Sequence, residues 1–199
     1  MHLLILGDSG RTGKQFDVAL MRSPSSSAPR PVLTPIPETP MQREGMAREF
    51  GASPTPPEAV LVALSLRRVS DSPFAAISPD TPDGFVANAI FVMKYFVTKR
   101  IIILNQWGAG SSLAVCANMR YGLPATDAVD EETRQTGVEF VVEPACVLAG
   151  GDPAPVQLYP ENGEEIRSLL KATRASVARF MVEAYEKGGF ADKSPGISN

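Results

Sequence analysis

Three glycines, Gly7, Gly10 and Gly13, recur at intervals of three residues in the segment GDSGRTG, directly after an apolar run at residues 3–6. A phosphate group needs a tight turn, inward-pointing backbone N–H groups and no side chain in its way, and glycines placed here supply all three. A helix that begins after such a turn adds a partial positive charge. The spacing is GxxGxxG and not GxGxxG, and a plain turn is the alternative. The position directly after a strand favours binding of a nucleotide pyrophosphate.

The rest of the chain alternates short apolar runs with amphipathic segments. The runs predict buried strands at residues 3–6, 59–64, 101–104 and 138–142. Between and after them, apolar residues at helical spacing predict helices at residues 41–50, 85–97, 126–136 and 175–185, and residues 149–165 are expected to form a loop region. Strand–helix alternation of this kind predicts an α/β fold with a doubly wound parallel sheet. No repeat or second domain is apparent, so residues 1–199 are expected to form one domain.

The glycine loop also carries a resemblance. GDSGRTGKQ resembles the GATGxTGxx loop of atypical short-chain dehydrogenases, namely the NmrA-like group and the biliverdin-IXβ/flavin reductase type. Further similarities follow in order along most of the chain, at residues 21–25, 59–65, 100–107, 127–130 with Gly137, and 173–180. The resemblance implies a Rossmann-like domain that binds NADP, with NAD as the alternative cofactor.

The same resemblance implies roles for individual residues. Those of the glycine loop would bind the cofactor: Gly7, Ser9, Gly10, Arg11, Thr12 and Gly13. Arg22 would hold the 2′-phosphate of NADP, for which a planar guanidinium is well suited, although a solvated surface arginine is an equal alternative. Leu64 and Ser65 would lie beside the adenosine ribose, and the backbone of Pro144 would face the nicotinamide.

Two adjacent carboxamides, Asn105 and Gln106, follow the run at residues 101–104. Ligands of parallel α/β sheets bind beyond the carboxyl ends of the strands. A carboxamide both donates and accepts hydrogen bonds, so these side chains are expected to orient the substrate. The alternative is that they bond to nearby backbone and close the strand.

The chain departs from the family pattern in its first βαβ unit. Only nine residues separate Leu6 from the apolar segment at residues 16–21, whereas a parallel crossover with its helix takes roughly ten to twelve. Residues 13–22 therefore form either the first helix or the second strand. Phe16, Ala19 and Leu20 share a helical face and favour the helix, while the match at residues 21–25 favours the strand. We expect the helix, with Arg22 displaced and the second strand missing or rebuilt from residues 32–36. A second contraction follows residues 107–112.

Catalytic groups are few. Tyr95 and Lys99 have the Tyr-x-x-x-Lys spacing of short-chain dehydrogenases, but they precede the run at residues 101–104, so the spacing is expected to be coincidental. Tyr121 has no lysine four residues on, and the one histidine, His2, opens the first run. Cys116 and Cys146 lie far apart, show no metal-binding spacing and are expected to be reduced, so no metal site is predicted. Any redox chemistry would rest on the cofactor.

Composition narrows the function further. A net charge of −3 disfavours nucleic acid as a partner, and no apolar run approaches the roughly 20 residues of a membrane helix. With no secretory signal apparent, a cytoplasmic location is expected. Three functions remain: an NADP-dependent reductase of a flavin-like or small carbonyl substrate, a redox-silent NAD(P)-binding regulator, and an isomerase or cyclase on the same fold. A protein partner or a homo-oligomer is compatible with each.

Overall fold

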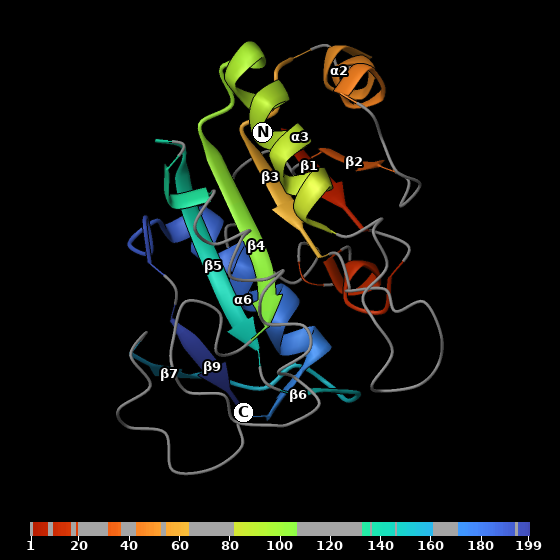
Figure 1. Ribbon diagram of the computed structural model, residues 1–199. Coiled ribbons are helices and arrows are strands. Elements are labelled where there is room, and N and C mark those ends of the chain that lie inside the picture. The colour runs from red at the N-terminus through yellow and green to blue at the C-terminus, as the bar shows by residue number, and fades with distance from the viewer. Residues whose placement is uncertain are drawn as a thin grey trace, which may run out of the picture.

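The computed structural model describes residues 2–7, 10–16, 19, 32–36, 43–52, 55–63, 82–106, 133–135, 137–145, 147–160, 171–193 and 195–199 (Figure 1). For residues 32–36, 82–85, 105–106, 140–145 and 147 it describes the backbone alone. The elements follow one another as β1 (His2–Leu6), η1 (Gly13–Gln15), β2 (Val32–Ile36), α2 (Arg43–Ala52), β3 (Ala59–Val62), α3 (Pro82–Phe96), β4 (Arg100–Gln106), β5 (Glu139–Ala145), β6 (Val147–Ala149), β7 (Gln157–Tyr159), β8 (Lys171–Thr173), α6 (Arg174–Lys187) and β9 (Gly196–Ser198).

Five strands form one parallel sheet in the order β2-β1-β3-β4-β5. Each of the four apolar runs forms one of these strands, because a strand that is covered on both faces needs apolar residues at successive positions. In β1 and β3 every residue is buried. The predicted α/β fold with a doubly wound parallel sheet is therefore confirmed.

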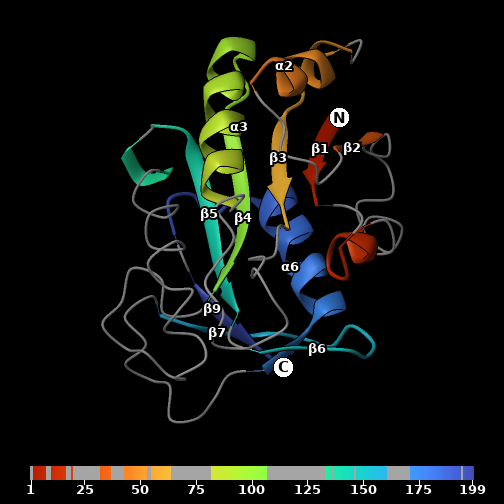
Figure 2. The same cartoon turned by 45° about the vertical axis from the view of Figure 1, so that its right-hand side comes forward.

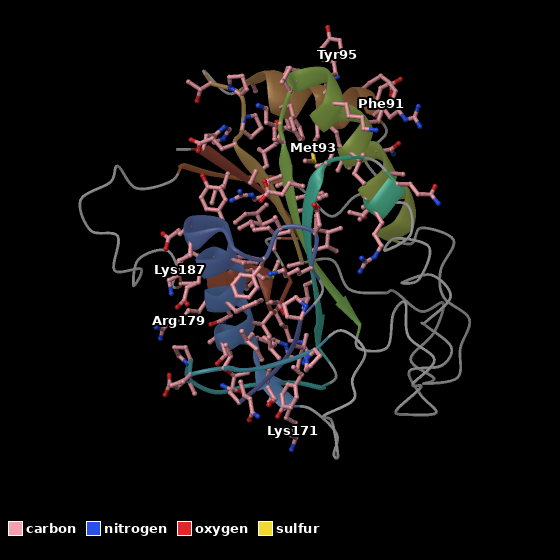
Figure 3. The ribbon with its side chains drawn as sticks, turned by 90° about the vertical axis from the view of Figure 1, so that its left-hand side faces the viewer. Phe91, Met93, Tyr95, Lys171, Arg179 and Lys187 are labelled. Carbon is pink, nitrogen blue, oxygen red and sulfur yellow. The ribbon has the colours of Figure 1, made fainter. Side chains whose placement is uncertain are left out.

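Side chains of successive strand residues point to opposite faces of the sheet, and helices cover both faces. On one face Leu4 and Leu6 pack with Met46 and Phe50 of α2 and with α3. On the other face Leu3 and Ile5 pack with Phe16 and with α6. Figure 2 shows α3 and α6 on opposite sides of the strands, and Figure 3 shows the same layers from the side. The carboxyl ends of β1 and β3 lie between these layers, at the edge where the glycine loop begins.

The short first unit is resolved in favour of the helix. After the glycine loop the chain forms the 3-10 turn η1, and Phe16 and Ala19 are helical and buried. The second strand is rebuilt from Val32–Ile36, which pairs in parallel with β1. Its Pro35 lacks an N–H group, which an edge strand tolerates because one side of the strand has no partner.

The C-terminal part contains more regular structure than expected. Residues 149–165 were expected to be loop, but β7 lies within them and pairs antiparallel with β9, while β6 pairs in parallel with β8. These strands have three residues each and lack a continuous apolar pattern, so the sequence did not reveal them. Asn199 bonds to Ser176 and to the amide of Thr173, and this holds the chain end against the first turn of α6.

One residue at the end of α3 is strained. Val97 has φ of 60°, a left-handed conformation that costs a residue with a branched Cβ about 1–2 kcal/mol. It follows α3 at the position where helices usually end on glycine, and the amide of Thr98 bonds back to the carbonyl of Met93 at 2.9 Å. The side chain is 71% exposed, so little packing depends on it.

We expect Val97→Gly to raise the free energy of unfolding by about 1 kcal/mol, because glycine adopts this conformation without the clash. Urea denaturation measures the change as a higher midpoint at an unchanged slope. Val97→Ala, which keeps a Cβ, serves as the control and should gain less. A lower midpoint for the glycine variant would contradict the assignment of strain.

Candidate dinucleotide-binding site

The order of the strands reverses at the carboxyl edge of the sheet, which is where open α/β sheets form a ligand-binding crevice. From β1 the chain crosses to β2 on one side, and β3, β4 and β5 follow on the other, so the direction reverses between β1 and β3. Ligands of open α/β sheets bind at such a reversal. Gly7 follows β1 here, and the amide of Ala63 after β3 bonds to the carbonyl of Leu6 at 2.9 Å. The glycine loop therefore begins at the expected binding crevice.

Hydrogen bonds fix the loop as a tight turn. Gly7 has φ of 87°, which glycine adopts without strain, and the amide of Gly10 bonds back to the carbonyl of Gly7 at 3.1 Å. The amide of Lys14 then bonds to the carbonyl of Gly10, and that of Gln15 to the carbonyl of Thr12. The turn therefore passes directly into η1, as the glycine spacing predicted.

Three successive backbone amides, those of Arg11, Thr12 and Gly13, have no acceptor among the described residues. Thr12 and Gly13 are buried, and buried N–H groups are rarely left without a partner in folded proteins. Consecutive free amides at the start of a helical turn suit an anion. The residues present therefore fit the diphosphate of a dinucleotide.

Two arginines flank this turn. Arg11 is exposed within the loop, and Arg174 begins α6, which packs beside η1 (Figure 2). Burial and the nearby charge of Arg11 lower the pKa of the Arg174 guanidinium. Neither guanidinium has an acceptor or a carboxylate partner among the described residues. Among the described residues, the charge where the loop meets α6 is therefore positive.

The structure places the predicted substrate residues at the same edge. Asn105 and Gln106 end β4, and in the strand register Asn105 lies opposite Pro144 of β5. β3 lies between β4 and β1 in the sheet. Two strand spacings, roughly 10 Å, therefore separate the strand that carries Asn105 from β1, after which the glycine loop begins. Four other predicted residues, Ser9, Arg22, Leu64 and Ser65, lie outside the described residues, as do Cys116, Tyr121 and Cys146.

The Tyr-x-x-x-Lys spacing lies at the wrong end of the sheet for catalysis. Tyr95 belongs to α3 and is 78% exposed, and Lys99 directly precedes β4, so both lie at the amino edge (Figure 3). His2 is also at this edge, where it is buried and contacts the carbonyl of Thr55. None of the three lies near the glycine loop, and the spacing is coincidental, as expected.

A hydrogen-bonded cluster holds α6 to the amino edge. The hydroxyl of Tyr185 donates to Glu58 at 2.9 Å, and Arg100 donates to the carbonyl of Tyr185 and pairs with Glu139. The bond from Tyr185 lowers the pKa of the Glu58 carboxyl. Burial and the bond to Glu58 raise the pKa of the Tyr185 phenol well above its ordinary 10.0. This cluster lies at the end of the sheet opposite the glycine loop and is structural.

The raised pKa of Tyr185 predicts a loss of stability at alkaline pH. The neutral phenol is favoured in the folded state, so its contribution is complete below the ordinary pKa of 10.0 and is lost as the pH rises above it. We expect the free energy of unfolding to fall above about pH 10, and to fall less in Tyr185→Phe. Urea denaturation at a series of pH values measures this. Tyr95→Phe, at an exposed ring, is the control, and an equal fall in Tyr185→Phe and wild type would contradict the prediction.

The sheet order and the glycine loop define a Rossmann-like α/β protein. The sequence matches no family model and no curated protein. Solved structures do share its fold. An oxidoreductase from Lactococcus lactis has a TM-score of 0.77 at 14% identity, covering 100% of this chain and 91% of that chain. A short-chain dehydrogenase/reductase from Veillonella parvula, solved in complex with NADP, has a TM-score of 0.69 at 12% identity, covering 100% and 94%.

A third similar structure is a protein from Streptococcus pneumoniae described as a candidate NADH-flavin reductase. Its TM-score is 0.65 at 13% identity, and the alignment covers 100% of this chain and 99% of that chain. At such low identities the likeness shows the fold alone. The chain thus has the fold of NAD(P)-binding Rossmann-type proteins over its whole length. Among the described residues, no helix is both long and apolar enough to span a membrane.

Sequence reasoning did not place Arg174 beside the glycine loop. Its segment, residues 173–180, is apparent as a helix start, because Thr173 accepts the amide of Ser176 as an N-cap. What the sequence does not contain is the packing of this helix beside a loop that lies more than 150 residues earlier in the chain. The only available signal was a positive residue at a helix start, where the helix dipole makes a positive charge unfavourable.

Proposed function

We propose that this protein is an NAD(P)H-dependent oxidoreductase that reduces a flavin-like or small carbonyl substrate. The observation that carries the proposal is the set of amides at Arg11, Thr12 and Gly13, which have no acceptor among the described residues and are located where the strand order reverses. The resemblance to the flavin reductase type and the fold shared with an NADP-bound protein support it. NADP is the proposed cofactor, and NAD is the alternative.

In this proposal the bound dinucleotide supplies the hydride, and the protein binds and orients. The loop amides hold the diphosphate, and the crevice directs the cofactor across β3 towards β4. Asn105 and Gln106 at the end of β4 then bind polar atoms of the substrate. A carboxamide is not an acid near neutral pH, so its contribution is to position and polarise the substrate.

Titration of the purified protein with NADPH and NADH, followed by fluorescence, tests the first step. We expect saturable binding of at least one of them, because the loop provides an anion site beside the crevice. If neither cofactor binds, the oxidoreductase proposal is wrong and the isomerase or cyclase function gains support. Binding without reduction of flavin or simple quinones would instead support a redox-silent regulator.

Steady-state reduction of flavin and simple quinones by NADPH tests the second step. We expect the double variant Asn105→Ala with Gln106→Ala to lose turnover by about 10-fold to 100-fold while its affinity for NADPH is kept, because each lost hydrogen bond costs about 0.5–1.5 kcal/mol. Phe91→Ala, at a 54% exposed side chain of α3, is the control. Unchanged turnover would make the two carboxamides structural.

A further inference from the structure

The glycine loop and the start of α6 bring two positive side chains together, and no described residue forms an ion pair with either of them. Arg11 lies within the loop, and Arg174 is the first residue of α6. The described carboxylates that form ion pairs do so with other partners: Glu139 with Arg100, and Glu183 with Arg179 and Lys187. Like charges that remain unpaired in a folded protein reduce its stability, so this arrangement suggests a ligand of opposite charge.

The position of Arg174 on its helix independently suggests a ligand of negative charge. A positive side chain in the first turn of a helix opposes the helix dipole, and the first turn of α6 contains no acidic residue to compensate it. The stability of α6 comes from elsewhere: Thr173 caps it, and Val177, Ala178 and Met181 pack against the sheet. Arg174 therefore has no evident role in holding the helix.

The glycine loop also contains a buried hydroxyl group, that of Thr12, directly before η1. The Thr12 residue is only 6% exposed, and its side chain makes no capping bond to η1. Within the described part of the chain this hydroxyl has no hydrogen-bond partner. Burying a hydroxyl without a partner costs about 1–3 kcal/mol, so native proteins rarely keep one unless something binds it. Thr12 directly follows Arg11, and its own amide is one of the three free amides.

These groups share one chemistry. Two guanidinium groups and a hydroxyl all donate hydrogen bonds to oxygen atoms, and guanidinium groups bind phosphate with two parallel bonds. Chloride or a single carboxylate would leave most of these donors unused. The shared ligand chemistry is thus a phosphate group.

We propose that Arg174 acts with Arg11 and the Thr12 hydroxyl to bind a phosphate group of the dinucleotide, at the junction of the glycine loop and α6. This rests on the proposed function and adds a residue from the far end of the chain to the cofactor site. The phosphate is either the diphosphate, which NADH and NADPH share, or the 2′-phosphate, which only NADPH carries. In the second case Arg174 determines the preference for NADPH.

The test is titration of the full chain, as wild type and as Arg174→Gln, with NADPH and with NADH. Loss of one charge-assisted contact is expected to weaken binding by about 10-fold to 100-fold. An equal loss for both cofactors supports the diphosphate, and a loss for NADPH alone supports the 2′-phosphate. Unchanged affinity for both overturns the proposal. Circular dichroism verifies that the variant is folded, and Arg174→Lys, which keeps the charge, is expected to recover part of the affinity.

The control is Arg48→Gln, at an exposed arginine of α2 on the other face of the sheet. This variant should bind both cofactors as wild type does.

A second experiment measures the Tm with and without inorganic pyrophosphate, and it distinguishes failure of this proposal from failure of the proposed function. If wild type binds neither dinucleotide, the oxidoreductase proposal fails, and the Tm in pyrophosphate then decides the arginine site. A rise in Tm that is absent in Arg174→Gln supports the site, and no rise in wild type overturns it.

Discussion

Gly10→Val is expected to weaken NADPH binding by more than about 100-fold while the protein remains folded. Gly10 directly precedes the amides of Arg11, Thr12 and Gly13, which have no acceptor among the described residues, and a branched side chain where the backbone must approach the pyrophosphate is expected to take the anion's space. Losing two hydrogen bonds to a charged group costs about 3–6 kcal/mol, which corresponds to this change in affinity. Fluorescence titration beside circular dichroism measures both quantities.

The choice of Gly10 separates binding from folding. Gly7 has φ of 87°, so valine at position 7 would also strain the backbone. Valine at position 10 keeps the backbone N–H group that bonds to the carbonyl of Gly7. Gly150→Val is the control, because a Cβ there meets no atom within 4 Å. If the Gly10 variant binds NADPH like wild type, the glycine loop is not the cofactor site.

The parts of this fold that the sequence predicted are those encoded locally. A strand buried on both faces needs consecutive apolar residues, so β1, β3, β4 and β5 were apparent from their composition. The nine-residue spacing after Leu6 was likewise enough to exclude a full helix and a strand together, which left the second strand either missing or rebuilt from residues 32–36, and the structure has the rebuilt strand. Strand ends were less certain, since Arg100 and Gln106 belong to β4 although they are polar.

The candidate site was predicted only in part, for a related reason. The glycine turn is local, and its residues were enough to predict a tight turn whose backbone amides suit an anion. The closeness of Arg174 to Arg11 depends on how α6 packs on the sheet, and no pattern of spacing in the sequence encodes it. β8 places the start of α6 at the carboxyl edge, yet its three residues carry no strand signal.

The largest expected change in stability comes from two phenylalanines on opposite faces of the sheet. Phe16 is 0% exposed between the sheet and α6, and Phe50 is 1% exposed beside α3, with its ring centroid 5.7 Å from that of Phe96. Phe16→Ala and Phe50→Ala are each expected to lower the free energy of unfolding by about 3–5 kcal/mol, because each leaves a cavity in a packed core. Urea denaturation measures both.

Only one of the two variants should also affect the cofactor. Phe16 follows η1, and its amide donates to the carbonyl of Gly13, so its ring fixes the end of the glycine turn on the sheet. Phe50 has no contact with that turn and lies in the other core cluster. At a temperature where both variants are folded, we therefore expect NADPH affinity to fall about 10-fold in Phe16→Ala, a change of about 1.4 kcal/mol, and to stay unchanged in Phe50→Ala. Equal affinities in the two variants would mean that the glycine turn keeps its shape without Phe16, and that the amides of Arg11, Thr12 and Gly13 are held by the hydrogen bonds of the loop alone.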